Sequence, residues 1–341
     1  MSNYRHGLLF LVLSILMLLL FIADIFIGSV AISITDIFKV LFGNLPKDAP
    51  ESIIILQSRL PKALTAVVAG CALPVAGLFM QTFFRNPVAG PDILGVSAGS
   101  SLFVAMVMLT VGSWFSMDVV NSFGIIIAAI VGALVVLIII LAVATRIRDS
   151  ITLLIFGLMF GMAISAMVGV LQYYSSQGAL KLFVMWTFGS LGGVTWSQLY
   201  MLSAIVFVGM CIAFTQAKSL NILLLGEDYA RSLGVNIKRT QFIIILTTGI
   251  LTGAITAFCG PIAFIGIAVP HLARMLFKVN NHFVIIPASI LLGISILLVC
   301  DIIAQTPGNS GVLPLNSVTA FMGAPFIIYI IWKNQHIKRA F

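Results

Sequence analysis

Long uninterrupted apolar runs recur along this 341-residue chain and constrain its fold more than any other feature. Each run has about twenty residues, the length that an α-helix needs to cross the hydrocarbon core of a bilayer. Membrane β-strands would instead alternate apolar and polar residues over about ten positions. The pattern predicts an all-α integral membrane protein, one domain over residues 1–341, with ten spans near 8–30, 60–82, 92–112, 123–145, 151–174, 195–216, 240–258, 262–277, 283–304 and 316–333.

The composition places these runs in lipid and not in a soluble core. Hydrophobic residues make up 61% of the chain and charged residues 8%, whereas a soluble domain carries about 25% charged residues. A net charge of +8 would suggest nucleic-acid binding in a soluble protein. No basic cluster is interleaved with loop aromatics here, so we expect basic membrane loops and no nucleic-acid partner.

The loop charges predict how the spans are oriented. If both termini are cytoplasmic, 13 of the 18 Lys and Arg residues fall inside and five fall outside. This distribution follows the positive-inside rule. An even number of spans agrees with it, so we expect a multi-pass protein of the inner (plasma) membrane with both termini in the cytoplasm. The five outer cations are Lys39, Lys47, Arg59, Lys62 and Lys181.

Ionisable residues are scarce within the spans. Ion-coupled secondary transporters place acids or histidines in mid-membrane, but Asp24, Asp92 and Asp301 lie toward span ends. His271 stands alone in the eighth span, which is short and which Pro270 is expected to break. The four cysteines form no CxxC pair. We therefore expect no catalytic residue, no metal site and no bound cofactor.

The inner loop over residues 217–239 is too long for a simple turn. Leu220–Leu225 is a short apolar helix candidate that Gly226 would end. Glu227–Leu233 is a second candidate, with acids in its first turn and an arginine after them, the charge order that a helix dipole favours. The residues alone leave two interpretations open: a docking surface for another protein, or an ordinary interfacial loop.

The fifth predicted span carries a small residue at every fourth position: Gly157, Gly161, Ser165 and Gly169. Such a stripe allows neighbouring helices to approach closely. In a channel, the same stripe would line a wide path. The spacing alone favours close packing.

Seven ordered motifs, between about residues 55 and 333, carry a resemblance to a known family. They are RLPK (59–62), QTFFRNP (81–87) with PDILGVSAG (91–99), WTFGSL (186–191), LGEDYARSLGV (225–235), GPIAFIG (260–266) with VPHLAR (269–274), Asp301 near the end of the ninth span, and GAPF (323–326). With them the chain resembles the FecCD-like permeases of type II ABC importers, which take up iron-siderophores, haem and cobalamin.

The resemblance implies a type II ABC importer permease fold with ten helices per subunit, and a transport role without enzymatic activity of its own. It implies a second permease copy in a homodimer, two cytoplasmic ATPase subunits that bind ATP and Mg²⁺, and a periplasmic substrate-binding protein. The expected substrate is an iron chelate, either a siderophore complex or haem. A cobalamin importer is the alternative, and an ion-coupled secondary transporter is a more distant one.

The resemblance also implies roles for individual residues. Arg59 and Lys62 would dock the binding protein, and snorkelling to the interface is the alternative for both. Some relatives carry an arginine where this chain has Gln305, so docking would use fewer charges. The implied coupling helices over 219–234 include Leu220, Leu225, Gly226, Glu227, Asp228 and Arg231; the implied cytoplasmic gate is Asn86, Val88, Ser150 and Thr152; and the implied path follows Gly157, Gly161, Ser165 and Gly169.

Overall fold

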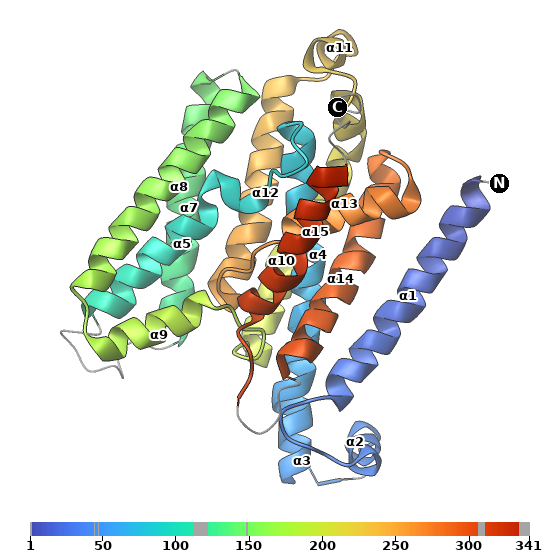
Figure 1. Ribbon diagram of the computed structural model, residues 1–341, viewed down its shortest axis with the longest axis vertical. Helices are drawn as coiled ribbons and strands as arrows, with labels where there is room; N and C mark the ends of the chain where they lie inside the picture. Colours follow the sequence, from blue (N-terminus) through green and yellow to red (C-terminus); the bar gives the residue numbers. More distant parts are fainter. Residues whose placement is uncertain are drawn as a thin grey trace.

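A computed structural model describes residues 2–43, 45–46, 48–111, 122–147, 149–305 and 311–333, and these ranges contain helices and no strand. The helices form one bundle (Figure 1). The long helices are α1 (Ser2–Phe26), α4 (Leu60–Phe83), α7 (Ser122–Arg146), α8 (Ser150–Tyr173), α10 (Trp196–Leu223), α12 (Ile237–Cys259), α14 (His282–Gln305) and α15 (Leu315–Lys333). The shorter ones are α2 (Ile34–Leu41), α3 (Pro50–Ile53), the π-helical η1 (Ile54–Arg59) and η3 (Met106–Val111), the 3-10 helix η2 (Pro91–Leu94), α5 (Val96–Ala105), α9 (Gln177–Thr187), α11 (Glu227–Ser232) and α13 (Ile265–Phe277).

The predicted all-α membrane fold is confirmed. Seven helices within the described ranges are long and apolar enough to cross a bilayer. Three shorter apolar helices, over Val96–Thr110, Ile265–Phe277 and Leu315–Ile328, stand where the third, eighth and tenth spans were predicted. Helix length and composition therefore identify seven of the ten predicted crossings. The last residue of the predicted third span, at position 112, lies outside the described residues.

The eighth span is interrupted in a different place from the one predicted. Pro270 lies inside the continuous helix α13. The break comes before this helix, where Gly260 and Phe264 adopt positive φ angles of 74° and 69°. With 13 residues, α13 is only about 20 Å long, which is less than the ~30 Å thickness of a hydrocarbon core. The Ala263 amide donates to Asn316 Oδ1 over 3.1 Å, so protein groups satisfy this non-helical backbone.

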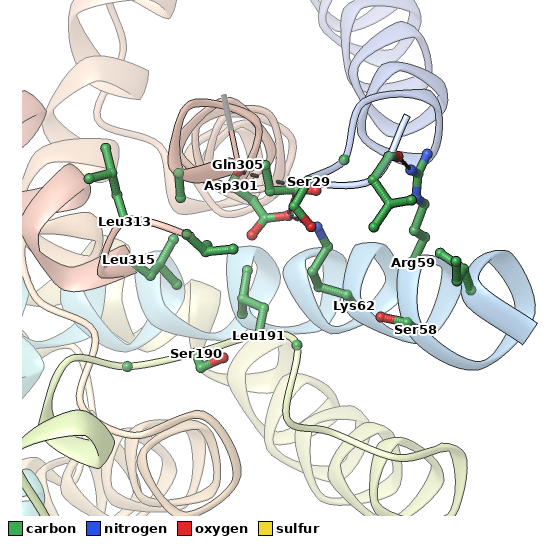
Figure 2. A pocket seen from close by; sticks show the side chains of 17 residues that line it. Ser29, Ser58, Arg59, Lys62, Ser190, Leu191, Asp301, Gln305, Leu313 and Leu315 are labelled. Carbon is green, nitrogen blue, oxygen red and sulfur yellow. Dashed lines mark hydrogen bonds and ion pairs between the residues drawn. The ribbon is translucent and has the colours of Figure 1, made fainter. Parts of the chain in front are cut away.

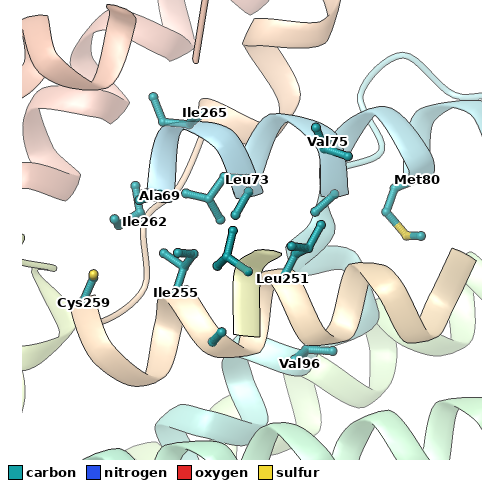
Figure 3. Close-up of a cluster of buried hydrophobic side chains, with 14 of the residues drawn as sticks. Ala69, Leu73, Val75, Met80, Val96, Leu251, Ile255, Cys259, Ile262 and Ile265 are labelled. Carbon is teal, nitrogen blue, oxygen red and sulfur yellow. The ribbon is translucent and has the colours of Figure 1, made fainter. Parts of the chain in front are cut away.

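Helix α4 lies in the middle of the bundle. Its buried residue Leu73 faces Leu251 and Ile255 of α12 (Figure 3). Small residues let other helices come close to it: a Cβ on Gly70 would lie 2.6 Å from the Cα atom of Ile294, and a Cβ on Gly77 would overlap the backbone of α13. Without a hydrophobic driving force in lipid, such close backbone contact is what holds membrane helices together.

The bundle has two distinct ends (Figure 1). Helices α2 and α3 lie at one end, here called the α2 end. Helix α11 and the first residues of α1 lie at the other, here called the α11 end. Helix α2 lies between the first and second predicted spans, and α3, η1 and α4 form one helical run over Pro50–Phe83. Helix α9 was not predicted, because its 11 residues are too few for a span.

Apolar side chains remain exposed along α1 and α8, the two least buried of the seven long spans. On α1 they include Leu11, Ile15 and Leu19, and on α8 they include Met159 and Met162. Large contiguous apolar surfaces of this kind mark contact with lipid or with another protein. They agree with a bundle that lies within a membrane.

Candidate functional site

Arg59 lies at the α2 end, where the π-helical η1 meets α4. Its side chain is turned toward the end of α1, and only 4% of the residue is exposed. The Nη1 atom donates to the carbonyls of Ile25 and Phe26 over 2.9 and 3.0 Å, and Nη2 donates to the carbonyl of Val30. The guanidinium therefore satisfies the last carbonyls of α1, which have no partner within their own helix.

Lys62 follows one turn later and forms an ion pair with Asp301 of α14. Its Nζ atom lies 2.9 Å from Asp301 Oδ2. Gln305 joins the same cluster, because its Nε2 atom lies 2.8 Å from Asp301 Oδ2 and 3.1 Å from Asp24 Oδ1. Asp24 of α1 is completely buried. Through these contacts, side chains of α1, α4 and α14 meet in one polar cluster inside the α2 end.

A pocket of about 240 Å³ opens beside this cluster (Figure 2). Lys62 and Asp301 lie side by side in its lining, and Ser190 and Leu191 approach from the segment between α9 and α10. That segment is held in place because the Ser190 amide donates to the Cys259 carbonyl over 2.7 Å. Part of the connection between α14 and α15, over residues 306–310, lies outside the described residues.

The positions of Arg59 and Lys62 differ from what a docking surface requires. Docking by these residues assumed exposed cations, but Arg59 is buried and the Lys62 side chain is 12% exposed. Both are engaged with groups of their own chain. Gln305, predicted only as a missing positive charge, is a bridge between two carboxyl groups. Their docking role stays a prediction.

The coupling residues predicted at 219–234 lie at the α11 end, but as one short helix and not two. Residues 220–223 are the last turn of α10, and Leu220 is fully buried. Gly226 precedes α11 with a φ of 115°, a conformation open to glycine and strained for other residues. Helix α11 keeps the predicted charge order, since Glu227 and Arg231 lie 3.9 Å apart on its exposed surface. Leu225 is 63% exposed.

The reason for the longer α10 is a contact that the local sequence does not show. Asn221 Oδ1 accepts from the His282 backbone amide over 2.7 Å, and Asn221 Nδ2 donates to Asn281 Oδ1 over 2.9 Å. The His282 ring also reaches Thr82 Oγ1 of α4 at 2.9 Å. The end of α10 is therefore tied to α4 and to the start of α14.

The predicted gate residues lie close to α11. Arg85, in the loop after α4, donates from Nη2 to the Leu223 carbonyl over 3.4 Å. In the same loop the Asn86 side chain accepts from the Val88 amide over 3.1 Å, and Val88 itself is exposed. A cleft of about 580 Å³ separates this loop from α8 and α11; it is lined by Arg85, Asp149, Leu225, Gly226, Glu227, Asp228 and Tyr229.

Thr152 belongs to the cap that starts α8. Its amide and its hydroxyl both donate to Asp149 Oδ2, over 2.7 and 2.6 Å. These hydrogen bonds hold the pKa of Asp149 below its usual range, so the cap is charged at neutral pH. Ser150 is the first residue of α8, and its side chain lies outside the described parts of the chain. The structure thus brings the predicted gate and coupling residues to one end of the bundle.

The small-residue stripe of α8 divides into two halves. Gly157 is buried, and a Cβ there would lie 2.6 Å from the Ile93 carbonyl oxygen. Gly161 lies beside Gly95, and a Cβ on Gly161 would be 3.6 Å from the Gly95 Cα atom, an ordinary van der Waals contact. Ser165 and Gly169 are exposed, and no atom lies within 4 Å of a Cβ built on Gly169. Close packing explains the first half of the stripe, and only the second half is free to line a path.

Across the described residues, no group of three or more His, Cys, Asp or Glu side chains is placed to hold a metal ion. Cys71, Cys211, Cys259 and Cys300 are free thiols.

The comparisons with known proteins agree with this arrangement. The model of the FecCD transport family matches residues 15–333. The chain belongs to the FecCD transport family. Among its relatives, the hemin transport system permease protein HmuU of Yersinia pestis is 33% identical over 95% of both chains. The vitamin B12 import system permease protein BtuC of Klebsiella pneumoniae is 35% identical over 84% of this chain and 85% of its own.

A solved structure extends the FecCD likeness to three dimensions. It is described as an inward-facing conformation of a metal-chelate type ABC transporter, and it matches with a TM-score of 0.83 and 26% identity over 96% of this chain and 99% of its own. The fold is therefore that of a type II ABC importer permease. As a FecCD protein, the chain is a transmembrane transport subunit and not an enzyme in itself.

Proposed function

We propose that this chain is the permease of an ABC importer that moves an iron chelate, either a siderophore complex or haem, across the inner membrane. The match of the FecCD family model to residues 15–333 is the observation that carries this proposal. The name of the HmuU relative and the description of the structural neighbour both support a metal chelate as substrate. A cobalamin is the second candidate, because relatives named as vitamin B12 permeases are as similar as HmuU.

The assembly that we propose has two permease copies, two cytoplasmic ATPase subunits that bind ATP and Mg²⁺, and a periplasmic binding protein. The α11 end faces the cytoplasm in this proposal, with both termini on that side. The exposed surface of α11 and the adjoining cleft support an ATPase contact there, because Leu225 and Arg231 are exposed. The binding protein then meets the α2 end.

Transport follows from movement at the two ends. ATP-driven closure of the ATPases moves α11 about Gly226, and Arg85 passes this movement to the loop of Asn86 and Val88. That loop and the start of α8 form the cytoplasmic gate, and the open half of the α8 stripe lines the path. At the α2 end, an acidic residue of the binding protein would compete with Asp301 for Lys62, so Lys62 and Arg59 remain docking candidates.

The substrate is tested with the complete importer in proteoliposomes. Haemin, a ferric siderophore and cyanocobalamin are offered with the cognate binding protein, and uptake is measured with and without ATP. ATP-dependent uptake of haemin or the siderophore supports the proposal. Uptake of cyanocobalamin alone selects the second candidate. Uptake that an ionophore abolishes, and that ATP depletion leaves intact, supports an ion-coupled transporter instead.

The coupling role is tested with the double variant Glu227→Ala/Arg231→Ala. Its matched control is Asp36→Ala/Lys39→Ala, which removes the exposed ion pair of α2 at the opposite end. We expect the α11 variant to lose ATP-driven uptake while the control keeps it. Equal uptake by both variants would remove the coupling role of α11.

A further inference from the structure

Positively charged side chains surround a hollow between α10, α11 and α12 at the α11 end. The hollow has a volume of about 400 Å³. Its lining contains two cations, Lys218 and Arg239, and no acidic residue. The lining also includes the side-chain amides of Gln216 and Asn236 and the hydroxyls of Ser219 and Thr240. A hollow with cations, amides, hydroxyls and no carboxylate is suited to an anion.

Neither cation has an ion-pair partner among the residues that the structure describes. Within the described ranges, the ion pairs are Lys39–Asp36, Lys62–Asp301 and Arg231–Glu227, so Lys218 and Arg239 take part in none. The two like charges line one hollow and therefore raise its positive potential. An anion that enters the hollow meets both of them.

The start of α12 adds to the same potential. Asn236 caps this 23-residue helix and also lines the hollow. Its Oδ1 atom accepts from the Arg239 amide over 3.1 Å. A helix carries a partial positive charge at its N-terminus, so the helix end and the two side chains act in the same direction.

Two exposed aromatic rings near the hollow favour a lipid over a free anion as its ligand. Phe214 precedes Lys218 by one turn on α10, and Phe242 follows Arg239 by one turn on α12; each is 47% exposed. Residues spaced by three or four positions share a helix face. On both helices the cation therefore lies nearer the α11 end and the ring lies deeper in the bundle, as the headgroup and acyl regions of a phospholipid require.

We propose that this hollow binds the phosphate headgroup of an anionic phospholipid, with the acyl chains along Phe214 and Phe242. Leu233 and Gly234 also line the hollow, so the bound headgroup touches the end of α11. The consequence for transport rests on the proposed function: in the cytoplasmic leaflet, where anionic headgroups attract basic segments, the lipid supports the helix that contacts the ATPase.

The test measures lipid binding to the full-length purified permease, without any transport assay. Nanodiscs of phosphatidylcholine receive increasing amounts of labelled phosphatidylglycerol, and the bound label is measured. We expect Lys218→Gln/Arg239→Gln to bind phosphatidylglycerol about 30-fold more weakly than the natural chain, from the lost attraction of two basic side chains. Lys218→Arg/Arg239→Lys keeps both charges and should retain the affinity.

The matched control is Arg146→Gln/Lys278→Gln, which removes two exposed cations from the ends of α7 and α13. This control should bind phosphatidylglycerol like the natural chain. Equal losses in both double variants, or equal binding of labelled phosphatidylcholine, would overturn the proposal. Displacement of the lipid by millimolar inorganic phosphate would overturn the lipid assignment and indicate a free-phosphate site.

The two proposals fail separately. If phosphatidylglycerol does not bind while the importer still takes up haemin, only the lipid site is wrong. If phosphatidylglycerol binds as expected and the importer takes up no candidate substrate, only the proposed transport function is wrong.

Discussion

Lys62 Nζ lies 2.9 Å from Asp301 Oδ2, and this ion pair joins α4 to α14 inside the α2 end. The side chains are 12% and 7% exposed, so water does little to screen the two charges. Gln305 and Asp24 complete the cluster. An acid and a base that are costly alone within a membrane become tolerable as a pair.

Breaking this pair from one side is expected to destabilise the fold. Lys62→Met leaves Asp301 without its cation, and Asp301→Asn leaves Lys62 without its anion. Loss of one member of a buried pair typically costs about 3–5 kcal/mol. Thermal unfolding of the purified chain in detergent should therefore show a lower midpoint for each variant.

The double variant Lys62→Met/Asp301→Asn tests whether the two side chains stabilise each other. It leaves no uncompensated charge at these two positions, so its midpoint should fall by less than the sum of the two single losses. Lys39→Met removes one member of an exposed pair and should leave the midpoint unchanged. Additive losses in the double variant would show that Lys62 and Asp301 do not stabilise each other.

Arg59 is predicted to anchor the end of α1 to α4. Its guanidinium donates to the carbonyls of Ile25, Phe26 and Val30, and a buried acceptor left without a donor costs about 1–3 kcal/mol. Both Arg59→Met and Arg59→Lys should loosen this end, because an ammonium lacks the planar fork that reaches several carbonyls. Faster tryptic cleavage at Lys39 would report the loosening. If Arg59→Lys were cleaved at Lys39 no faster than the natural chain, the planar guanidinium would not be needed to hold this end.

Close backbone packing of α4 on α13 predicts a severe effect of one methyl group. A Cβ on Gly77 would overlap the Gly266 carbonyl, which is backbone and cannot rotate away. We expect Gly77→Ala to reduce the yield of folded, monodisperse protein sharply. Gly7→Ala is the matched control, since no atom lies within 4 Å of a Cβ at that position. Normal yield and melting of Gly77→Ala would show that the two helices are further apart than described.

The course of the membrane-spanning segments could be predicted from the sequence because hydrocarbon thickness sets the length of an apolar run. The positions at which the helical backbone is interrupted were harder to predict. Pro270 is the obvious helix breaker in the eighth span, yet the chain turns at Gly260 and Phe264, where two positive φ angles are held by contacts with distant residues. The contact of Ala263 with Asn316 joins residues 53 positions apart, so the sequence around either residue does not indicate it.

In the candidate site, too, local features could be predicted from the sequence and long-range contacts could not. Spacing and charge order predicted α11, because they act within one turn of helix. The first predicted mini-helix is not separate, because residues 220–223 continue α10, whose end is held by the pairing of Asn221 with Asn281 and His282 some 60 residues away. Asp24 was treated as a span-end acid. A carboxyl group within an apolar membrane helix is costly unless it is paired, so the sequence position of Asp24 already indicated that it has a partner.

Gly226 is predicted to be required for coupling and not for folding. Its φ of 115° and ψ of 150° fall in a region that is essentially restricted to glycine, and another residue there costs about 1–3 kcal/mol. Gly226→Ala should therefore displace α11 and reduce ATP-driven uptake while the bundle melts normally. Gly178→Ala, at a site with open space and no positive φ, is the control. Unimpaired uptake by Gly226→Ala would contradict a pivot at this residue.

The two halves of the α8 stripe allow packing and transport to be separated on one helix. Gly157→Ala places a methyl group 2.6 Å from the Ile93 carbonyl oxygen, so it should lower the melting midpoint and reduce uptake together. Gly169→Phe places a large ring where no atom lies within 4 Å, so the purified chain should melt normally. If this face lines the path, the ring narrows it, and uptake by the reconstituted importer should fall while ATP hydrolysis continues. Normal uptake by Gly169→Phe would show that the open half of the stripe faces lipid, and would leave close packing as the only role of these small residues.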